Sequence, residues 1–319
     1  MSTYRDALPQ LDGSIFLTDS GIETDLIFHH GYELPEFAAF PLVDDESGAA
    51  VLRNYYRQHA QVAKDSNVGF ILEAATWRAN IDWASLLGYS EVSLDRVTRS
   101  AVAMLVELRD ELGESAGPLV ISGAVGPRGD AYSPGALMRP EEAQRYHSAQ
   151  IETFAKTQID LVTALTLTHT TEAIGIANAA AAVGIPAVIS FTVEVDGKLP
   201  DGTALGDAIE IVDKATSATG SLPAYYGINC AHPTHFLAAL SPDAAWTKRI
   251  RMIRANASRM SHAELDNASD LDDGDPDELG REYAEILERF PHINVLGGCC
   301  GTDVRHIRSV AAACIGPGT

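Results

Sequence analysis

The chain has 319 residues, a length that fits either two ordinary domains or one large α/β barrel. Hydrophobic residues make up 46% of it and charged residues 21%, so it can bury a sizeable core. With 23 Lys and Arg against 44 Asp and Glu, the formal net charge is −21, which argues against nucleic acid and anionic membranes as partners.

Neither a secretion signal nor a membrane span is evident in the sequence. The N-terminal residues MSTYRDALPQLDGS lack a basic region followed by an apolar one. The apolar runs end well before the roughly 18 residues that a membrane span needs. Four cysteines in a chain of this length argue against a disulfide scaffold, so we expect a cytoplasmic, reducing location.

Eight short apolar runs alternate with longer stretches of helical character. In chain order the runs are residues 14–20, 69–76, 119–126, 160–168, 186–193, 225–230, 249–256 and 293–300. They are nearly continuously apolar, as expected for strands buried on both faces of a parallel sheet. Eight strand–helix units are the outline of a (β/α)8 barrel. A doubly wound open sheet would show the same alternation, so periodicity alone leaves both folds open.

Three of the four cysteines end predicted strands. Cys230 ends YYGINC, and Cys299 with Cys300 ends INVLGGCC. In a barrel these thiols would meet at the same mouth, where three thiolates suit zinc and leave one coordination position open, as in catalytic zinc sites. Adjacent residues on a strand point to opposite faces, so both neighbours can reach one ion only if the backbone turns sharply. The flanking glycines permit such a turn.

Cysteines in this chain have two other possible interpretations besides metal binding. A free cysteine is commonly a buried core residue, and this is our interpretation of Cys314 in SVAAACIG. A vicinal disulfide between Cys299 and Cys300 would be strained, and a reducing compartment disfavours it.

The segments GGCCGTDVRHI and GINCAHP resemble the two zinc signatures of the homocysteine S-methyltransferase family. The resemblance continues through TDSGIETDL, SGAVGPRGD and PAVISFTVEVDGKLPDGTAL, and so covers nearly the whole chain. It implies an α/β fold with one domain over residues 1–319, a single (β/α)8 TIM barrel. It also implies a zinc ion held by Cys230, Cys299 and Cys300 at the C-terminal ends of the strands.

The activity implied by the resemblance is zinc-dependent methyl transfer from a small sulfonium or ammonium donor to a thiol. Homocysteine is the leading acceptor, and methionine the product. A thiol that occupies the open zinc position loses its proton and becomes a nucleophile. S-methylmethionine, S-adenosylmethionine and a betaine are the candidate donors. A non-catalytic zinc- or thiol-binding protein is the alternative from another functional class.

The family pattern also indicates substrate contacts near the ends of several strands. Asp19 is the candidate for the acceptor's amine, with the backbone of Ser20 and Gly21 for its carboxylate. The full set of candidate substrate-binding residues is Asp19, Ser20, Gly21, Thr24, Glu73, Thr76 and Asn229. Trp77 and Tyr226, with Trp83 and Tyr225, could form an aromatic cage over the donor cation, although core packing is the alternative.

Two positions depart from the family pattern. Glu23 stands where a glycine is usual, and Leu165 aligns with a fourth-strand glutamate that binds the homocysteine amine. Without that carboxylate a buried ammonium would lack part of its partner, at a cost of several kcal/mol. Either Glu73 or Glu23 supplies the missing charge, or the acceptor is a different thiol without the amino-acid head group.

Overall fold

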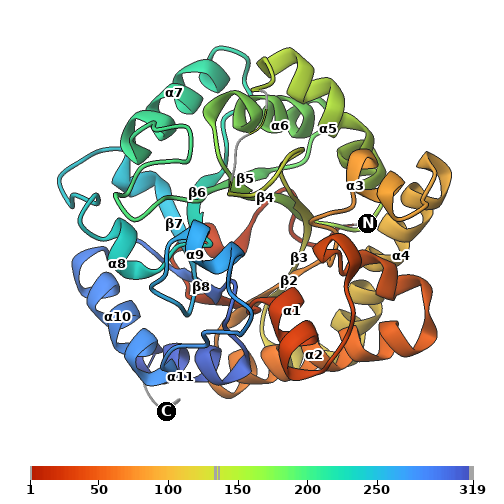
Figure 1. Ribbon diagram of the computed structural model, residues 1–319, viewed down its shortest axis with the longest axis horizontal. Helices are drawn as coiled ribbons and strands as arrows, with labels where there is room; N and C mark the ends of the chain where they lie inside the picture. Colours follow the sequence, from red (N-terminus) through yellow and green to blue (C-terminus); the bar gives the residue numbers. More distant parts are fainter. Residues whose placement is uncertain (1, 133–134, 136, 316–319) are drawn as a thin grey trace.

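The computed structural model describes residues 2–132, 135 and 137–315. Eight parallel strands, β1 to β8 in sequence order, form a closed barrel with helices around its outside (Figure 1). Closure is direct, because β1 pairs with β2 on one side and with β8 on the other. The predicted (β/α)8 TIM barrel is therefore confirmed, and the open sheet is excluded.

Each of the eight predicted apolar runs contains one strand. The strands are β1 (Phe16–Thr18), β2 (Gly69–Glu73), β3 (Leu119–Val125), β4 (Leu161–Leu167), β5 (Ala187–Phe191), β6 (Tyr225–Asn229), β7 (Ile250–Ala255) and β8 (Val295–Gly298). Within these described strands, every residue except Arg251 is buried. Burial on both faces explains why the runs are continuously apolar rather than alternating.

Helices follow the strands and cover the barrel. The longer ones are α2 (Glu46–Asp65), α4 (Glu91–Leu112), α5 (Pro140–Ala155), α6 (Thr170–Ala182), α7 (Leu205–Ser217), α10 (Pro276–Arg289) and α11 (Val304–Ile315). The shorter ones are α1 (Ile22–Thr24), α3 (Ile81–Leu86), α8 (Pro233–Phe236) and α9 (His262–Asp266). Helix α10 begins as its acidic, proline-containing start predicts, because the Asp275 carboxylate accepts the backbone N–H groups of Asp277 and Glu278.

The core of the barrel has two parts, because successive strand residues face opposite sides of the barrel wall; a third, small cluster packs Phe40 and Ala84 near Val97 outside it. The larger part packs the outer faces of the strands against the helices. The smaller part fills the barrel interior with side chains such as Phe16, Ile71, Leu161 and Met252. A filled interior confines the space for a ligand to the mouth of the barrel.

A buried carboxylate fastens the N-terminal segment to the barrel. Asp160 accepts the backbone N–H groups of Thr3 (2.8 Å), Tyr4 (2.7 Å) and Ile121 (2.9 Å). The side chain of Arg109 lies 3.5 Å from Oδ2, the oxygen that also accepts the Ile121 N–H. Asp160 is fully buried, so these contacts are what compensate its charge.

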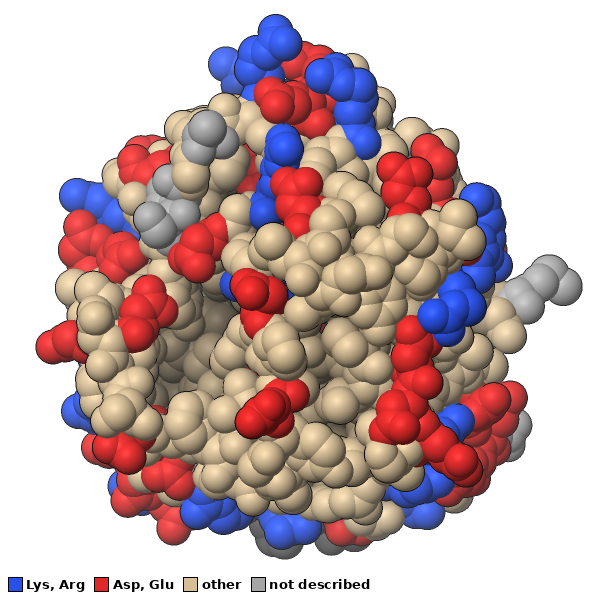
Figure 2. Space-filling model, turned by 45° about the vertical axis from the view of Figure 1, so that its right-hand side comes forward, with Lys and Arg blue, Asp and Glu red and all other residues tan. Residues whose placement is uncertain are grey.

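The surface carries the acidic excess of the sequence. In Figure 2, Asp and Glu side chains are spread over the visible face and around a hollow in it, whereas Lys and Arg lie mainly toward the outline. Within the described residues, no helix combines the length and apolar character that crossing a membrane requires.

Asp160→Ala tests the fastening of the N-terminal segment. The change leaves a partly buried guanidinium and three backbone N–H groups without their acceptor. We expect the free energy of unfolding to fall by about 3–5 kcal/mol in urea titrations. Glu107→Ala, which removes only an exposed pair with Arg53, is the control and should change stability little. Equal stabilities for the two variants would contradict the assigned role of Asp160.

Candidate active site

A cavity at the carboxyl ends of the strands gathers most of the predicted site residues. The predicted residues among those lining it are Asp19, Ser20, Gly21, Thr24, Glu73, Trp77, Asn229, Cys230, Cys299 and Cys300. Ala74, Ala75, Ala124 and Leu165 form apolar parts of the same wall. The cavity is therefore a polar and sulfur-bearing site within a largely apolar enclosure.

The three strand-end cysteines meet in this cavity. Cys230 follows β6 directly, and Cys299 and Cys300 follow β8. Their Sγ atoms all lie within 4.8 Å of one another. Cys230 is buried, whereas Cys299 and Cys300 are partly exposed. A donor set of three close sulfurs at a cavity wall fits a zinc ion with a position left for a ligand.

Two of these cysteines are joined in a disulfide, which the sequence analysis did not anticipate. Cys230 pairs with Cys299 across two strand ends, with their Cα atoms 5.3 Å apart. Cys300 is a free thiol, 4.0 Å from the Cys230 sulfur. The vicinal pairing of Cys299 with Cys300 is not formed. Because metals bind cysteine as thiolate, a zinc ion can occupy this site only after the disulfide is reduced.

Asn229 braces the strand ends beside Cys230. Its Oδ1 accepts the Thr166 backbone N–H at 2.9 Å, and its Nδ2 donates to the Thr166 hydroxyl at 2.7 Å. Thr166 and Cys230 both have left-handed backbones, with φ of 61° and 53°. Such conformations are costly for residues with side chains and persist where the surroundings enforce them. Asn229, a predicted substrate contact, thus has a clear role in holding β4 against β6.

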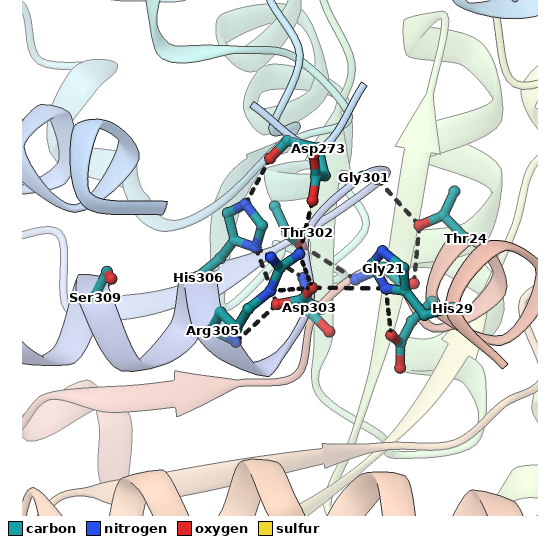
Figure 3. Close-up of polar contacts among 12 residues, drawn as sticks. Gly21, Thr24, His29, Asp273, Gly301, Thr302, Asp303, Arg305, His306 and Ser309 are labelled. Carbon is teal, nitrogen blue, oxygen red and sulfur yellow. Dashed lines mark hydrogen bonds and ion pairs between the residues drawn. The ribbon is translucent and has the colours of Figure 1, made fainter. Parts of the chain in front are cut away.

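The loop after β8 is held by the first turn after β1 (Figure 3). The Gly301 N–H donates to the Thr24 hydroxyl at 3.0 Å, and that hydroxyl donates to the Gly21 carbonyl at 3.0 Å. The Thr302 hydroxyl donates to the Cys299 carbonyl at 2.7 Å. A Cβ on Gly21 would collide with the same Cys299 carbonyl. Gly21 and Thr24 therefore position the cysteine loop as well as lining the cavity.

Asp303 fixes the start of α11 immediately after this loop (Figure 3). Its carboxylate accepts the Arg305 backbone N–H at 2.7 Å and contacts the Arg305 guanidinium and the His306 ring. Burial alone would raise the pKa of Asp303, but the hydrogen bonds from His306 and Arg305 outweigh it and hold the pKa well below its usual value. The loop is thus anchored at both ends.

Two of the predicted substrate-binding carboxylates already have a cationic partner within the protein. Arg254, in β7, places Nη2 at 2.7 Å from Asp19 and Nη1 at 2.6 Å from Glu73. Its Nε donates to the Gly298 carbonyl at 3.1 Å, and Ser122 donates to Glu73 at 2.6 Å. All three charged groups are buried. Burial raises the pKa of Asp19 to about 6, although the Arg254 charge opposes the rise.

The predicted aromatic cage is only partly assembled. Trp77 lines the cavity and donates from Nε1 to the Leu165 carbonyl at 3.2 Å. The Arg78 guanidinium lies over Trp77 at 4.4 Å and over Trp83 at 3.8 Å from the ring centroids. The two tryptophans therefore already contact a cation that belongs to the chain.

Tyr226 and Thr76 do not line the cavity. The Tyr226 hydroxyl donates to Asp213 on α7 at 2.7 Å, and its ring stacks on Phe191. Thr76 is buried and donates to the Ala124 carbonyl at 2.9 Å. Tyr226 is excluded as a cage residue by this position, because it faces the helix layer rather than the barrel mouth.

Sequence reasoning missed two residues of this site. Arg254 had a visible signal, since it is a charged residue near the C-terminal end of the predicted strand RIRMIRAN. Tyr132 had none, since it lies far from Cys300 in the sequence, yet its hydroxyl donates to the Cys300 sulfur at 3.7 Å. Both contacts depend on how distant loops meet at the mouth of the barrel.

Comparison with known proteins points to one family. The model of the family described as homocysteine S-methyltransferase matches residues 17–314. Among solved structures, the metallated form of the homocysteine methyltransferase MmuM from Escherichia coli has a TM-score of 0.72 at 23% identity. Its oxidized form has a TM-score of 0.74 at 21% identity. Each alignment covers 96% of this chain and 98% of the other. No curated protein matched the chain.

Arg254→Met tests the charge balance of the site. Without the guanidinium, the pKa of the Asp19 carboxyl in the folded protein, which burial already raises to about 6, should rise further above its value in the unfolded chain. The folded state then binds more protons than the unfolded chain between about pH 4 and 7, so its stability rises as pH falls. We expect a loss of about 3–5 kcal/mol in unfolding free energy near neutral pH, with partial recovery near pH 5.5.

Urea titrations at both pH values measure this effect. Arg249→Met is the matched control, because it breaks a half-buried pair with Asp213 beside the same strand. Its stability should not recover on acidification. An Arg254→Met variant that loses stability equally at both pH values would show that the two carboxylates do not depend on the guanidinium.

Proposed function

Because the chain belongs to the homocysteine S-methyltransferase family, we propose that it moves a methyl group from a small sulfonium or ammonium donor to homocysteine, giving methionine. The observation that supports this most is the convergence of the Cys230, Cys299 and Cys300 sulfurs within 4.8 Å at the cavity. Three thiolates are the ligand set of a zinc site that keeps one position for substrate.

A zinc ion held by these cysteines would supply a position at which the acceptor thiol loses its proton. The chain's own groups support the sulfurs, since each lies near one hydrogen-bond donor. The pairs are the Thr166 hydroxyl with Cys230 (3.7 Å), Asn229 Nδ2 with Cys299 (3.8 Å) and the Tyr132 hydroxyl with Cys300 (3.7 Å). Hydrogen bonds to the charged form of a group favour that form, so these donors stabilise thiolates.

The apolar part of the cavity suits the transfer step. A thiolate that attacks an onium methyl group neutralises charge as the new bond forms. The separated ions lose more from removal of water than the transition state does, so an enclosure with little water favours the reaction. Ala74, Ala124 and Leu165 provide such a surface beside the cysteines. The same thiolate requirement favours a reducing compartment such as the cytoplasm.

A different thiol acceptor is the second candidate. Arg254 already occupies Asp19 and Glu73, and the β4 position carries Leu165 rather than an acid. Those two observations leave Asp19, Glu73 and the β4 position without a free carboxylate for an ammonium group, so this candidate is an acceptor that lacks one. An assay that crosses homocysteine and 4-sulfanylbutanoate with S-methylmethionine, S-adenosylmethionine and glycine betaine separates the two candidates. No transfer from any donor to either thiol would reject both and favour a non-catalytic binding protein.

Cys299→Ala tests the zinc site. The reduced wild-type protein should contain roughly one zinc ion per chain, since three thiolates and one open position make a single site. The variant should lose both the metal and the methyl transfer, because two cysteines remain. Cys314→Ala is the control, since Cys314 lies in α11 outside the cavity and should retain both properties.

Elemental analysis and the methyl-transfer assay give the two readouts. Wild-type protein prepared without reductant should bind less zinc, because the Cys230–Cys299 disulfide withholds two ligands. Full zinc content in Cys299→Ala would refute the assignment of the ligands.

A further inference from the structure

One carboxylate that lines the cavity has no direct ion-pair partner among the described side chains. Glu23, in α1, lines the cavity together with Asp19 and Glu73. Those two bind Arg254 at 2.7 and 2.6 Å. Across the described residues, no side chain forms an ion pair or hydrogen bond with Glu23, which bonds its own backbone N–H. The positive charges of Arg78 and Arg254 act on it only from a longer distance.

The position of Glu23 makes this charge costly. The side chain is half-buried beside the cysteines. Burial raises its pKa to about 7, and the nearby Asp19 charge adds to the rise. A cation bound in the cavity would remove this unfavourable energy.

We propose that Glu23 binds the ammonium group of the acceptor, and that the acceptor is therefore an aminothiol. The inference deepens the proposed function and rests on it. Asp19 and Glu73 are committed to Arg254, and Leu165 on β4 carries no charge, so Glu23 is the cavity carboxylate with capacity for a substrate cation.

The acceptor fits Glu23 better than the methyl donor does. An onium donor loses its positive charge when its methyl group leaves. A carboxylate beside that charge would stabilise the bound donor more than the transition state and would slow transfer. The ammonium of the acceptor keeps its charge throughout, so an ion pair with Glu23 lowers the energies of the bound acceptor and the transition state equally.

Glu23→Gln tests this assignment with ligands that differ only in the amino group. Calorimetry on reduced, zinc-loaded protein compares homocysteine with 4-sulfanylbutanoate, its analogue without the amine. The variant should bind homocysteine about 10- to 100-fold more weakly, as expected for loss of a hydrogen bond to a charged group. Its affinity for 4-sulfanylbutanoate should match that of the wild type. Glu23→Asp, which keeps the charge, should retain part of the preference for the amine.

A second comparison needs neither zinc nor turnover. Methionine and 4-(methylsulfanyl)butanoate, which lack a thiol, should show the same loss of amine preference in the Glu23→Gln variant. In turnover, the KM for homocysteine should rise by the same factor, while kcat and the KM for the donor stay within about twofold.

The outcomes separate the assignment from the proposed function. Equal weakening of both thiols, unchanged homocysteine binding, or a rise confined to the donor KM would overturn the role of Glu23. A wild-type protein that discriminates the amine through Glu23 but methylates no thiol would uphold the assignment and refute the proposed function. Methyl transfer that does not distinguish homocysteine from 4-sulfanylbutanoate would uphold the proposed function and refute the role of Glu23.

Discussion

A single buried guanidinium holds the mouth of this barrel together. Arg254 reaches from β7 to Asp19 after β1 and to Glu73 at the end of β2, and it donates to Gly298 at the end of β8. Two carboxylates buried side by side need such a cation, since unpaired buried charges cost several kcal/mol each. The strand ends that carry the cysteines are therefore fixed by an ion cluster rather than by apolar packing alone.

The close approach of the β1 and β8 segments follows from this cluster. Gly21 contacts the Cys299 carbonyl so closely that no larger residue fits, and Gly301 turns with φ of 79°. The Thr24 hydroxyl then reaches the Gly301 N–H. These contacts turn two adjacent cysteines toward the sulfur of Cys230, which a regular strand could not do. The motif residues around the cysteines thus act largely through backbone geometry.

The barrel and the meeting of the cysteines could be predicted because both follow from local patterns. Apolar runs mark buried strands, and parallel closure brings the ends of β6 and β8 to one mouth. Strand alternation also shows why Tyr226 cannot share a face with Tyr225, since the former faces α7 and the latter lies in the barrel interior. The contacts of Arg254 with Asp19 could not be predicted, because they join residues 235 positions apart through side-chain geometry.

The geometry that suits a metal also suits oxidation. Three sulfurs within 4.8 Å can share one ion, but two of them can equally form the Cys230–Cys299 bond. Both states draw on the same thiolates, so each excludes the other. Hydrogen-bond donors at each sulfur favour the thiolate form, which assists metal binding and, at equilibrium, disfavours the disulfide. The fold therefore sets the distances between the sulfurs, while the redox state of the surroundings decides whether all three are available to a metal.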